Sequence, residues 1–140
     1  MSDTNNPLYE LEMKVRDYEC DIQQIVNNAV YQNYFEHTRH EFLRRLGVNF
    51  PSLSRRGIDL VVVHAEIDYH WPLHSGDLFV VTLDIGRCGP IKYIFQQNIF
   101  LLPKRRRIVT GVFHGASVSK GRPIVVPEVT RALSEARKLL

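Results

Sequence analysis

Apolar and charged residues alternate strictly near the start of the chain. The apolar positions are Tyr9, Leu11, Met13 and Val15, and a charged residue stands between each neighbouring pair. A period of two places all the apolar side chains on one face of an extended strand. We therefore predict a half-buried strand from Tyr9 to Val15, with one face in the core and the other in solvent.

A helical repeat replaces this alternation after Asn27 and Asn28. Between Ala29 and Leu46 one face collects Tyr31, Tyr34, Phe35, Thr38, Phe42 and Leu46, whereas the other faces collect Gln32, Asn33, Glu36, His37, Arg39, His40, Arg44 and Arg45. Asn27 or Asn28 is suited to cap the first turn, and Gly47 is suited to end the last one. The pattern predicts one long amphipathic helix.

Four β-like runs follow, after a polar loop around Pro51 and Gly57. They span 59–70, 78–85, 92–102 and 108–119, and short turns separate them, which predicts antiparallel neighbours in a meander. A short helix over 127–140 closes the chain. Because strand and helix do not alternate, the order predicts an α+β fold in which an antiparallel sheet wraps around one long central helix. We expect a single domain over residues 1–140.

Composition narrows the class of protein. The 140 residues are 44% hydrophobic, enough for one domain with a real core, and no apolar run reaches the length of about 20 residues that spans a bilayer. The first residues lack the features of a signal peptide, so we expect a cytoplasmic protein without membrane contact. Cys20 and Cys88 form no C-x-x-C pair, which argues against a zinc site or a disulfide framework.

Three residues carry a resemblance to a known family. Asp21, Val26 and Tyr31 match the spacing of the motif of the 4-hydroxybenzoyl-CoA thioesterase family, in particular the short acyl-CoA thioesterases of the bacterial Tol-Pal cluster. The segments 66–77 and 92–96 also fit this family. The resemblance implies the hot-dog fold and hydrolysis of an acyl-CoA or acyl carrier protein (ACP) thioester. It also implies a homodimer or homotetramer in which two subunits pair edge to edge, with the active sites at their interface.

The chemistry of a thioester suits a site with one carboxylate. Asp21 is the candidate general base or nucleophile, two roles that the sequence leaves open. The backbone N–H of Asn28, at the start of the helix, is the candidate oxyanion hole. A thiol with a pKa near about 8.5 leaves without a dedicated acid, so no cofactor is expected beyond the CoA of the substrate. Gln24 stands where the family has glycine, and its amide is a candidate for positioning water or the thioester.

Further contacts with the substrate follow from the resemblance and the pattern of charge. The residues expected to bind the substrate are Ile25, Val26, Asn27, Tyr31 and Phe35, and those expected near the CoA phosphates are Lys92 and Arg87. Tyr31, Tyr34 and Phe35 are the candidates for lining the acyl pocket. The basic run 104–107 lacks interleaved aromatic residues, so nucleic acid binding is disfavoured and a solvated hairpin tip is favoured.

Two other functions remain as alternatives. A non-catalytic acyl-thioester binder on the same fold is favoured only by Gln24. A hydratase or dehydratase of enoyl thioesters is weaker, because His70-Trp71-Pro72 lacks the glycine that completes the motif of hot-dog dehydratases. His37 and His40 have no third ligand in view, so no metal site is expected. Gly111 and Gly115 share one face of the last long run and predict a close approach by the helix or by another subunit.

Overall fold

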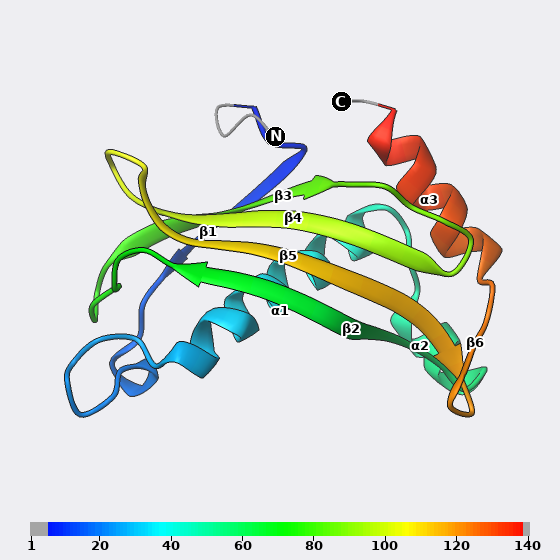
Figure 1. The fold of residues 1–140 in the computed structure, drawn as a ribbon, viewed down its shortest axis with the longest axis horizontal. Helices are drawn as coiled ribbons and strands as arrows, with labels where there is room; N and C mark the ends of the chain where they lie inside the picture. The colour runs from blue at the N-terminus through cyan, green and yellow to red at the C-terminus, as the bar shows by residue number, and fades with distance from the viewer. Residues whose placement is uncertain (1–5, 139–140) are drawn as a thin grey trace.

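A curved antiparallel sheet wraps around one long helix in the computed structural model, which describes residues 6–138 (Figure 1). The strands are β1 (Tyr9–Lys14), β2 (Ile58–Tyr69), β3 (Leu78–Ile85), β4 (Lys92–Leu101), β5 (Arg106–Ser119) and the two-residue β6 (Arg122–Pro123). The helices are α1 (Asn28–Arg45), α2 (Phe50–Arg55) and α3 (Pro127–Arg137), with a 3₁₀ turn, η1, at Asp17–Glu19. The predicted fold class and central helix are confirmed.

The order of the strands differs from the predicted meander. The sheet runs β1-β3-β4-β5-β2, so β3, β4 and β5 form a meander but β2 pairs with β5 and not with β3. The prediction that β2 and β3 are neighbours is therefore wrong. The connection 70–77 crosses from one edge of the sheet towards the other, where Val15 donates to the carbonyl of Asp77 (N···O 2.9 Å). This short segment can connect β2 to β3 because the sheet curls around α1, which brings its two sides close together.

Aromatic side chains fill the space between α1 and the sheet. Phe35 is fully buried and its ring packs on Phe113 of β5 at 5.0 Å between centroids, while Tyr34 packs on Phe79 of β3 at 4.6 Å. Burying a side chain of this size stabilises a fold by about 1.5–3 kcal/mol relative to leaving it in water. This face of α1 agrees with the predicted apolar stripe. Arg39 is an exception, because it was predicted on a polar face and is 7% exposed.

The ends of the helices show which boundaries the local sequence predicted correctly. Gly47 follows α1 with φ of +90°, the left-handed conformation that commonly ends a helix. Residues 50–55, expected as a loop, form α2 because the side chain of Asn49 accepts from the N–H of Ser52 (3.0 Å) and Pro51 occupies the first turn. The last helix ends at Arg137, and the predicted end at Leu140 lies outside the described residues.

Candidate active site

Asp21 opens a tight turn between η1 and α1. Its N–H donates to the carbonyl of Ile25 (2.9 Å), its carbonyl accepts from the N–H of Gln24 (2.9 Å), and Cys20 and Val26 form a β-bridge behind the turn. One carboxylate oxygen, Oδ1, accepts from the N–H of Gln23 (2.8 Å). This is an Asx-turn, the ordinary local role of aspartate. It fixes one oxygen and leaves Oδ2 without a hydrogen bond from any residue in the range 6–138.

Gln24 adopts the backbone conformation that glycine adopts most readily. Its φ is +67°, in the left-handed region, where an L-residue with a side chain is disfavoured. A type I turn followed by one left-handed residue is a common way to close a short hairpin, and it explains a glycine at this position in the family. The turn around Asp21 therefore keeps this geometry despite the side chain of Gln24.

The loop after β2 fastens this turn to α1. Ile25 forms a β-bridge with His74, and the N–H of Val26 donates to the carbonyl of Leu73 (2.9 Å). The N–H of Leu73 in turn donates to the hydroxyl of Tyr31 on α1 (3.0 Å). Burial, the main cause, raises the pKa of Tyr31, so this hydroxyl stays protonated. Hydrogen bonds thus join the turn, the loop after β2 and α1, and they hold Asp21 near the start of the helix.

Asn27 is the residue that caps α1. Its side-chain oxygen accepts from the N–H of Ala29 (3.0 Å), and its carbonyl accepts from Val30 (2.9 Å). The N–H of Asn28 donates to no acceptor in the described part of the chain, and the residue is exposed. The hydroxyl of Tyr69, at the end of β2, lies 3.4 Å from the carbonyl of Asn28. An open N–H at a helix start is suited to bind an oxyanion.

Three residues predicted to contact the substrate lie in the core. Val26 and Tyr31 are almost fully buried, and Phe35 is completely buried against Phe113. Ile25 is half-buried beside the Asp21 turn, and Asn27 is occupied as the cap. Their contact with substrate stays a prediction, and the single chain offers a ligand only Ile25 and Asn27 of this group.

Arg87 and Lys92 lie at the opposite end of the sheet from Asp21. Lys92 starts β4 and pairs with Ala116, whereas Tyr69, beside Asn28, pairs with Val109 at the other end of β5. Arg87 precedes Lys92 on the connection from β3. Within one chain these two cations are remote from the start of α1. Their role in binding CoA stays a prediction that requires a second subunit.

Cys20, next to Asp21, is a poor nucleophile. Its pKa is raised, first by burial of the thiol and then by the nearby carboxylates of Asp17, Asp21 and Glu19. A raised pKa keeps the thiol protonated, and a thiol attacks a carbonyl far more slowly than a thiolate. The carboxylate of Asp21 is the better candidate for the chemistry.

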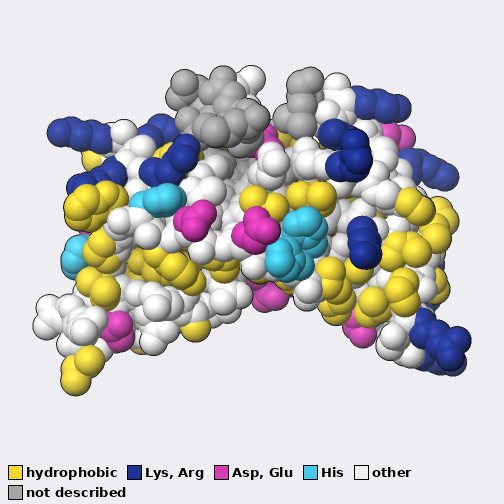
Figure 2. All heavy atoms as spheres, in the orientation of Figure 1, with side chains coloured by type: hydrophobic (Ala, Val, Ile, Leu, Met, Phe, Trp, Pro, Cys, Tyr) yellow, Lys and Arg dark blue, Asp and Glu magenta, His cyan; other side chains and the backbone are white. Residues whose placement is uncertain are grey.

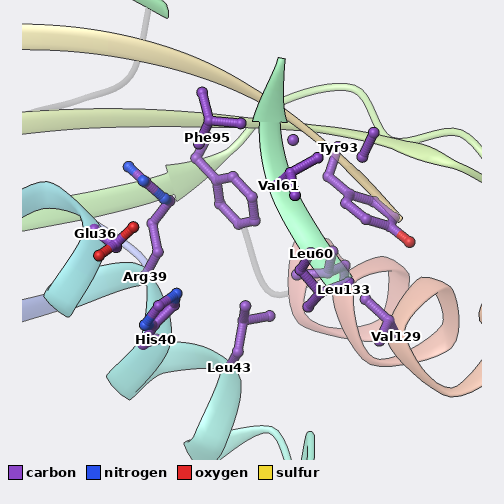
Figure 3. Close-up of a pocket in the computed structure, with 13 residues that line it drawn as sticks. Glu36, Arg39, His40, Leu43, Leu60, Val61, Tyr93, Phe95, Val129 and Leu133 are labelled. Atoms are coloured by element: carbon purple, nitrogen blue, oxygen red, sulfur yellow. The ribbon is translucent and has the colours of Figure 1, made fainter. Parts of the chain in front are cut away.

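A cavity lies further along α1 and was not predicted from the sequence. It has a volume of about 280 Å³ and lies between α1, β2, β4, β5 and α3 (Figure 3). Glu36, Arg39 and His40 line it from the helix, while most of its remaining walls are apolar. The sequence feature that could have indicated it is the spacing of Glu36, Arg39 and His40, which places three polar side chains on one surface of the helix.

No histidine in the range 6–138 belongs to a group of side chains arranged to hold a metal ion. His70, of the faint dehydratase motif, contacts the hydroxyl of Thr110 (3.1 Å) on the surface of the sheet. No helix of the described chain is long and apolar enough to cross a membrane.

Comparison with known proteins assigns the family. Residues 23–103 match the model of the thioesterase superfamily. The chain is 41% identical over 127 residues to the chloroplastic acyl-acyl carrier protein thioesterase ATL2 of Arabidopsis thaliana, covering 89% of this chain and 66% of that protein. It is 32% identical over 95 residues to the long-chain acyl-CoA thioesterase FadM of Escherichia coli, covering 68% of this chain and 71% of that protein.

The fold also matches solved structures. A 1,4-dihydroxy-2-naphthoyl-CoA thioesterase from Synechocystis superimposes with a TM-score of 0.84 at 18% identity, covering 91% of this chain and 96% of that one. At this identity the match supports the fold alone. The family model and the two relatives confirm the resemblance inferred from Asp21, Val26 and Tyr31. The chain belongs to the thioesterase superfamily, with the hot-dog fold.

Proposed function

We propose that this protein hydrolyses an acyl-CoA or acyl-ACP thioester to a carboxylic acid and a thiol. The observation that carries the proposal is that one short turn connects a carboxylate, that of Asp21, to an open backbone N–H, that of Asn28. Asp21 begins this turn, and the chain returns through Val26 directly to the capped start of α1, where the N–H of Asn28 is open. The names of the relatives support both carriers, because one is an acyl-ACP thioesterase and another an acyl-CoA thioesterase.

Asp21 acts on the attacking side of the thioester carbonyl. Its Oδ1 is held by Gln23, which orients the carboxylate, and Oδ2 faces the substrate. Oδ2 either removes a proton from the attacking water or attacks the carbonyl itself to give a mixed anhydride, which water then opens. Both routes need the same ionised carboxylate, so both predict the same loss when it is removed.

The start of α1 stabilises the negative charge on the carbonyl oxygen. The N–H of Asn28 has no acceptor within residues 6–138, and the aligned peptide dipoles of α1 add positive potential at this end. One such donor typically contributes about 10²- to 10³-fold to the rate. The thiolate leaves without a general acid because its pKa is low, and the proposed reaction requires neither metal nor cofactor.

The two alternatives gain no support from the geometry. The binder was favoured by Gln24, but this residue takes the left-handed backbone conformation and preserves the turn around Asp21. The dehydratase motif lacks its glycine, and the side chain of His70 contacts the hydroxyl of Thr110 on β5. Hydrolysis uses the half-buried carboxylate of Asp21 and the open helix start together, which neither alternative requires.

We also propose that two chains pair through β2. This strand is an edge of the sheet, twelve residues long, and its middle exposes Val61, Val62 and Val63. An unpaired edge of this length with exposed valines invites pairing with a second edge. On the face that β2 crosses in Figure 1, Figure 2 shows histidine and acidic side chains near the middle with apolar side chains on both sides.

An antiparallel pair of β2 strands would join opposite ends of two subunits. A two-fold axis near the middle of β2 sets Tyr69 and Asn28 of one subunit beside the Ile58 end of the other. The partner's Lys92 and Arg87, remote from Asp21 within one chain, then lie on the same side as the first subunit's helix start. A homodimer therefore makes the predicted CoA contacts feasible, and a homotetramer would consist of two such dimers.

The activity is tested by measuring thiol release from a panel of acyl-CoA and acyl-ACP substrates. Asp21→Asn keeps the shape and the Oδ1 acceptor but removes the negative charge. We expect the variant to lose about 10²- to 10⁴-fold in kcat/KM. Asp17→Asn is the matched control, because Asp17 is a nearby exposed carboxylate whose oxygen accepts from Ser75, and this variant should behave as wild type. Full activity of Asp21→Asn would refute the mechanism.

Oligomeric state is tested separately by analytical ultracentrifugation. Val63→Lys places a charge on a side chain that is 55% exposed in the single chain, so it should leave the fold intact. If β2 is the interface, the variant sediments at half the mass of wild type: as a monomer where wild type is a dimer, and as a dimer where wild type is a tetramer. A wild-type monomer, or a variant that sediments with the wild-type mass, would exclude the proposed pairing.

A further inference from the structure

The cavity beside α1 has apolar walls and one polar side. Leu43 of α1, Leu60 of β2, Phe95 of β4, and Val129 and Leu133 of α3 form most of its surface. Its polar side is the helix surface that carries Glu36, Arg39 and His40 (Figure 3). Exposed residues line it as well, among them Val62, so within one chain the cavity opens near β2, the edge proposed to pair with a second subunit.

Arg39 is a buried cation without an acidic partner. One of its nitrogens, Nη1, donates to the side-chain oxygen of Gln97 (3.0 Å), and the guanidinium lies over the ring of Phe113 at 4.4 Å. No carboxylate of the described chain lies within 4 Å of it, and Glu36 acts on it only at longer range. Burial lowers the pKa of Arg39 to about 10, so the group is still charged at neutral pH.

A charged guanidinium has five N–H donors, and Gln97 takes one. No buried side-chain nitrogen or oxygen in the range 6–138 lacks a partner, so the remaining nitrogens of Arg39 are accessible from the cavity or its mouth. Burying a charge with so few hydrogen bonds is costly in an apolar site. The donors therefore have unused capacity to bind an oxygen acceptor inside the cavity.

The neighbours of Arg39 select the kind of acceptor. Glu36 lies on the same side of the cavity and would repel a carboxylate or phosphate. Burial, the main cause, lowers the pKa of His40, so its ring is neutral at pH 7 and adds no positive charge. One shielded cation beside a carboxylate favours an uncharged oxygen, a hydroxyl or a ketone, over an anion.

The cavity and the candidate active site lie along the same helix and strand. Tyr69, at one end of β2, contacts Asn28, while Leu60 and Val61, near the other end, line the cavity. Arg39 is about 16 Å further along α1 than Asn28 at the rise of an α-helix. A volume of about 280 Å³ holds roughly nine groups of the size of a water or methylene. Both dimensions suit the distal part of an acyl chain.

We propose that this cavity binds the distal part of the acyl chain of the substrate, and that Arg39 selects chains that carry a hydroxyl or keto oxygen there. The inference rests on the proposed thioesterase function and adds the class of acyl group. The chain would reach the cavity past β2, either from the same subunit or from the one paired with it.

Binding is measured on the wild-type protein with thioethers of CoA, which cannot be hydrolysed. S-decyl-CoA is compared by calorimetry with derivatives that carry a hydroxyl or keto group at successive positions of the distal half. We expect at least one oxygenated derivative to bind about tenfold more tightly, the typical contribution of a hydrogen bond to a charged group. Arg39→Met should abolish this preference and leave the affinity for S-decyl-CoA similar or higher.

Gly115→Ala supplies a second variant that does not touch Arg39. Gly115 lines the cavity, and a Cβ added there would meet its nearest atoms, on Val61, Phe95 and Tyr93, at 3.6–3.8 Å, which is ordinary contact. The added methyl should weaken the binding of S-decyl-CoA several-fold and spare S-butyl-CoA. This result tests the location of the chain even if Arg39→Met fails to fold, as thermal unfolding will show.

The outcomes separate this inference from the proposed function. Equal affinity for all derivatives, or a preference that survives Arg39→Met, overturns the role of Arg39. Unchanged binding of S-decyl-CoA to Gly115→Ala overturns the location of the chain. Thiol release that depends on Asp21 can accompany either failure, and an oxygen preference that depends on Arg39 would persist even if Asp21→Asn were fully active.

Discussion

The two ends of α1 differ in what surrounds their polar groups. At its start, the carboxylate of Asp21 and the N–H of Asn28 are accessible and are positioned by backbone hydrogen bonds of a short turn. Further along, Arg39 is buried and is positioned by the core residues Phe113 and Gln97. The first arrangement suits chemistry on a substrate that arrives and leaves, whereas the second suits recognition of a chain held in a largely apolar cavity.

The largest expected effect is the difference in the free energy of unfolding between a substitution in the core and one in the Asp21 turn. Phe113→Ala removes a ring that packs against both Phe35 and Arg39, and we expect it to lower the free energy of unfolding by about 3–5 kcal/mol. Ile22→Ser, at the tip of the Asp21 turn, removes a side chain that is 98% exposed and should change it by less than about 0.5 kcal/mol. Urea unfolding of both variants measures the contrast, and similar losses would contradict it.

A smaller effect is expected at Gln24. Its left-handed conformation is unfavourable for a residue with a side chain, so Gln24→Gly should raise the free energy of unfolding by up to about 1 kcal/mol. Gln24→Val, with a branched Cβ, should lower it by about 1–2 kcal/mol. The same urea experiment reports both values.

The activity of Gln24→Gly separates a role in holding the turn from a role in contacting the substrate. If the turn serves only to hold Asp21, thiol release by this variant matches wild type. A large loss of kcat at unchanged stability would instead assign the amide of Gln24 to water or the thioester.

The smallest expected effect is the pH dependence contributed by His40. Burial lowers its pKa below 6.5 in the folded state, so the unfolded chain takes up a proton first as the pH falls. The stabilisation is complete above pH 6.5 and is lost as the pH falls from there through the lowered pKa. NMR titration of His40 gives the pKa directly, and His40→Gln should reduce the loss of stability between pH 7 and 5. A pKa at or above 6.5 would show that the ring is not desolvated.

Local patterns predicted most of the fold from the sequence. Alternation in 9–15 and the apolar stripe of α1 gave the strand and the helix, since each pattern reports which side of one element faces the core. The pairing of β2 with β5 was missed because it depends on how far the sheet curls, which no local pattern records. The burial of Arg39 was missed for a related reason, as its partners Gln97 and Phe113 come from distant strands.

The candidate active site was read from motif spacing and not from physics alone. Asp21 in an Asx-turn and Asn27 as a cap are ordinary local roles, and the structure contains both. The spacing to Val26 and Tyr31 gave these residues a chemical meaning, and the structure explains the spacing: Val26 closes the turn and Tyr31 holds the loop that fastens it. The cavity carried no such motif, because its walls come from five separate elements.

Single-turnover thiol release measures both assigned roles in one experiment: Asp21 in the chemistry and Arg39 in the selection of the chain. Decanoyl-CoA and an oxygenated decanoyl-CoA are mixed with excess wild type, Asp21→Asn or Arg39→Met. With the enzyme in excess over substrate but below the concentration that saturates binding, we expect Asp21→Asn to slow both substrates by about 10²- to 10⁴-fold and to leave the ratio of their rates unchanged. Arg39→Met should change this ratio while its rate with decanoyl-CoA stays close to that of wild type. Release by Asp21→Asn as fast as by wild type would contradict the account.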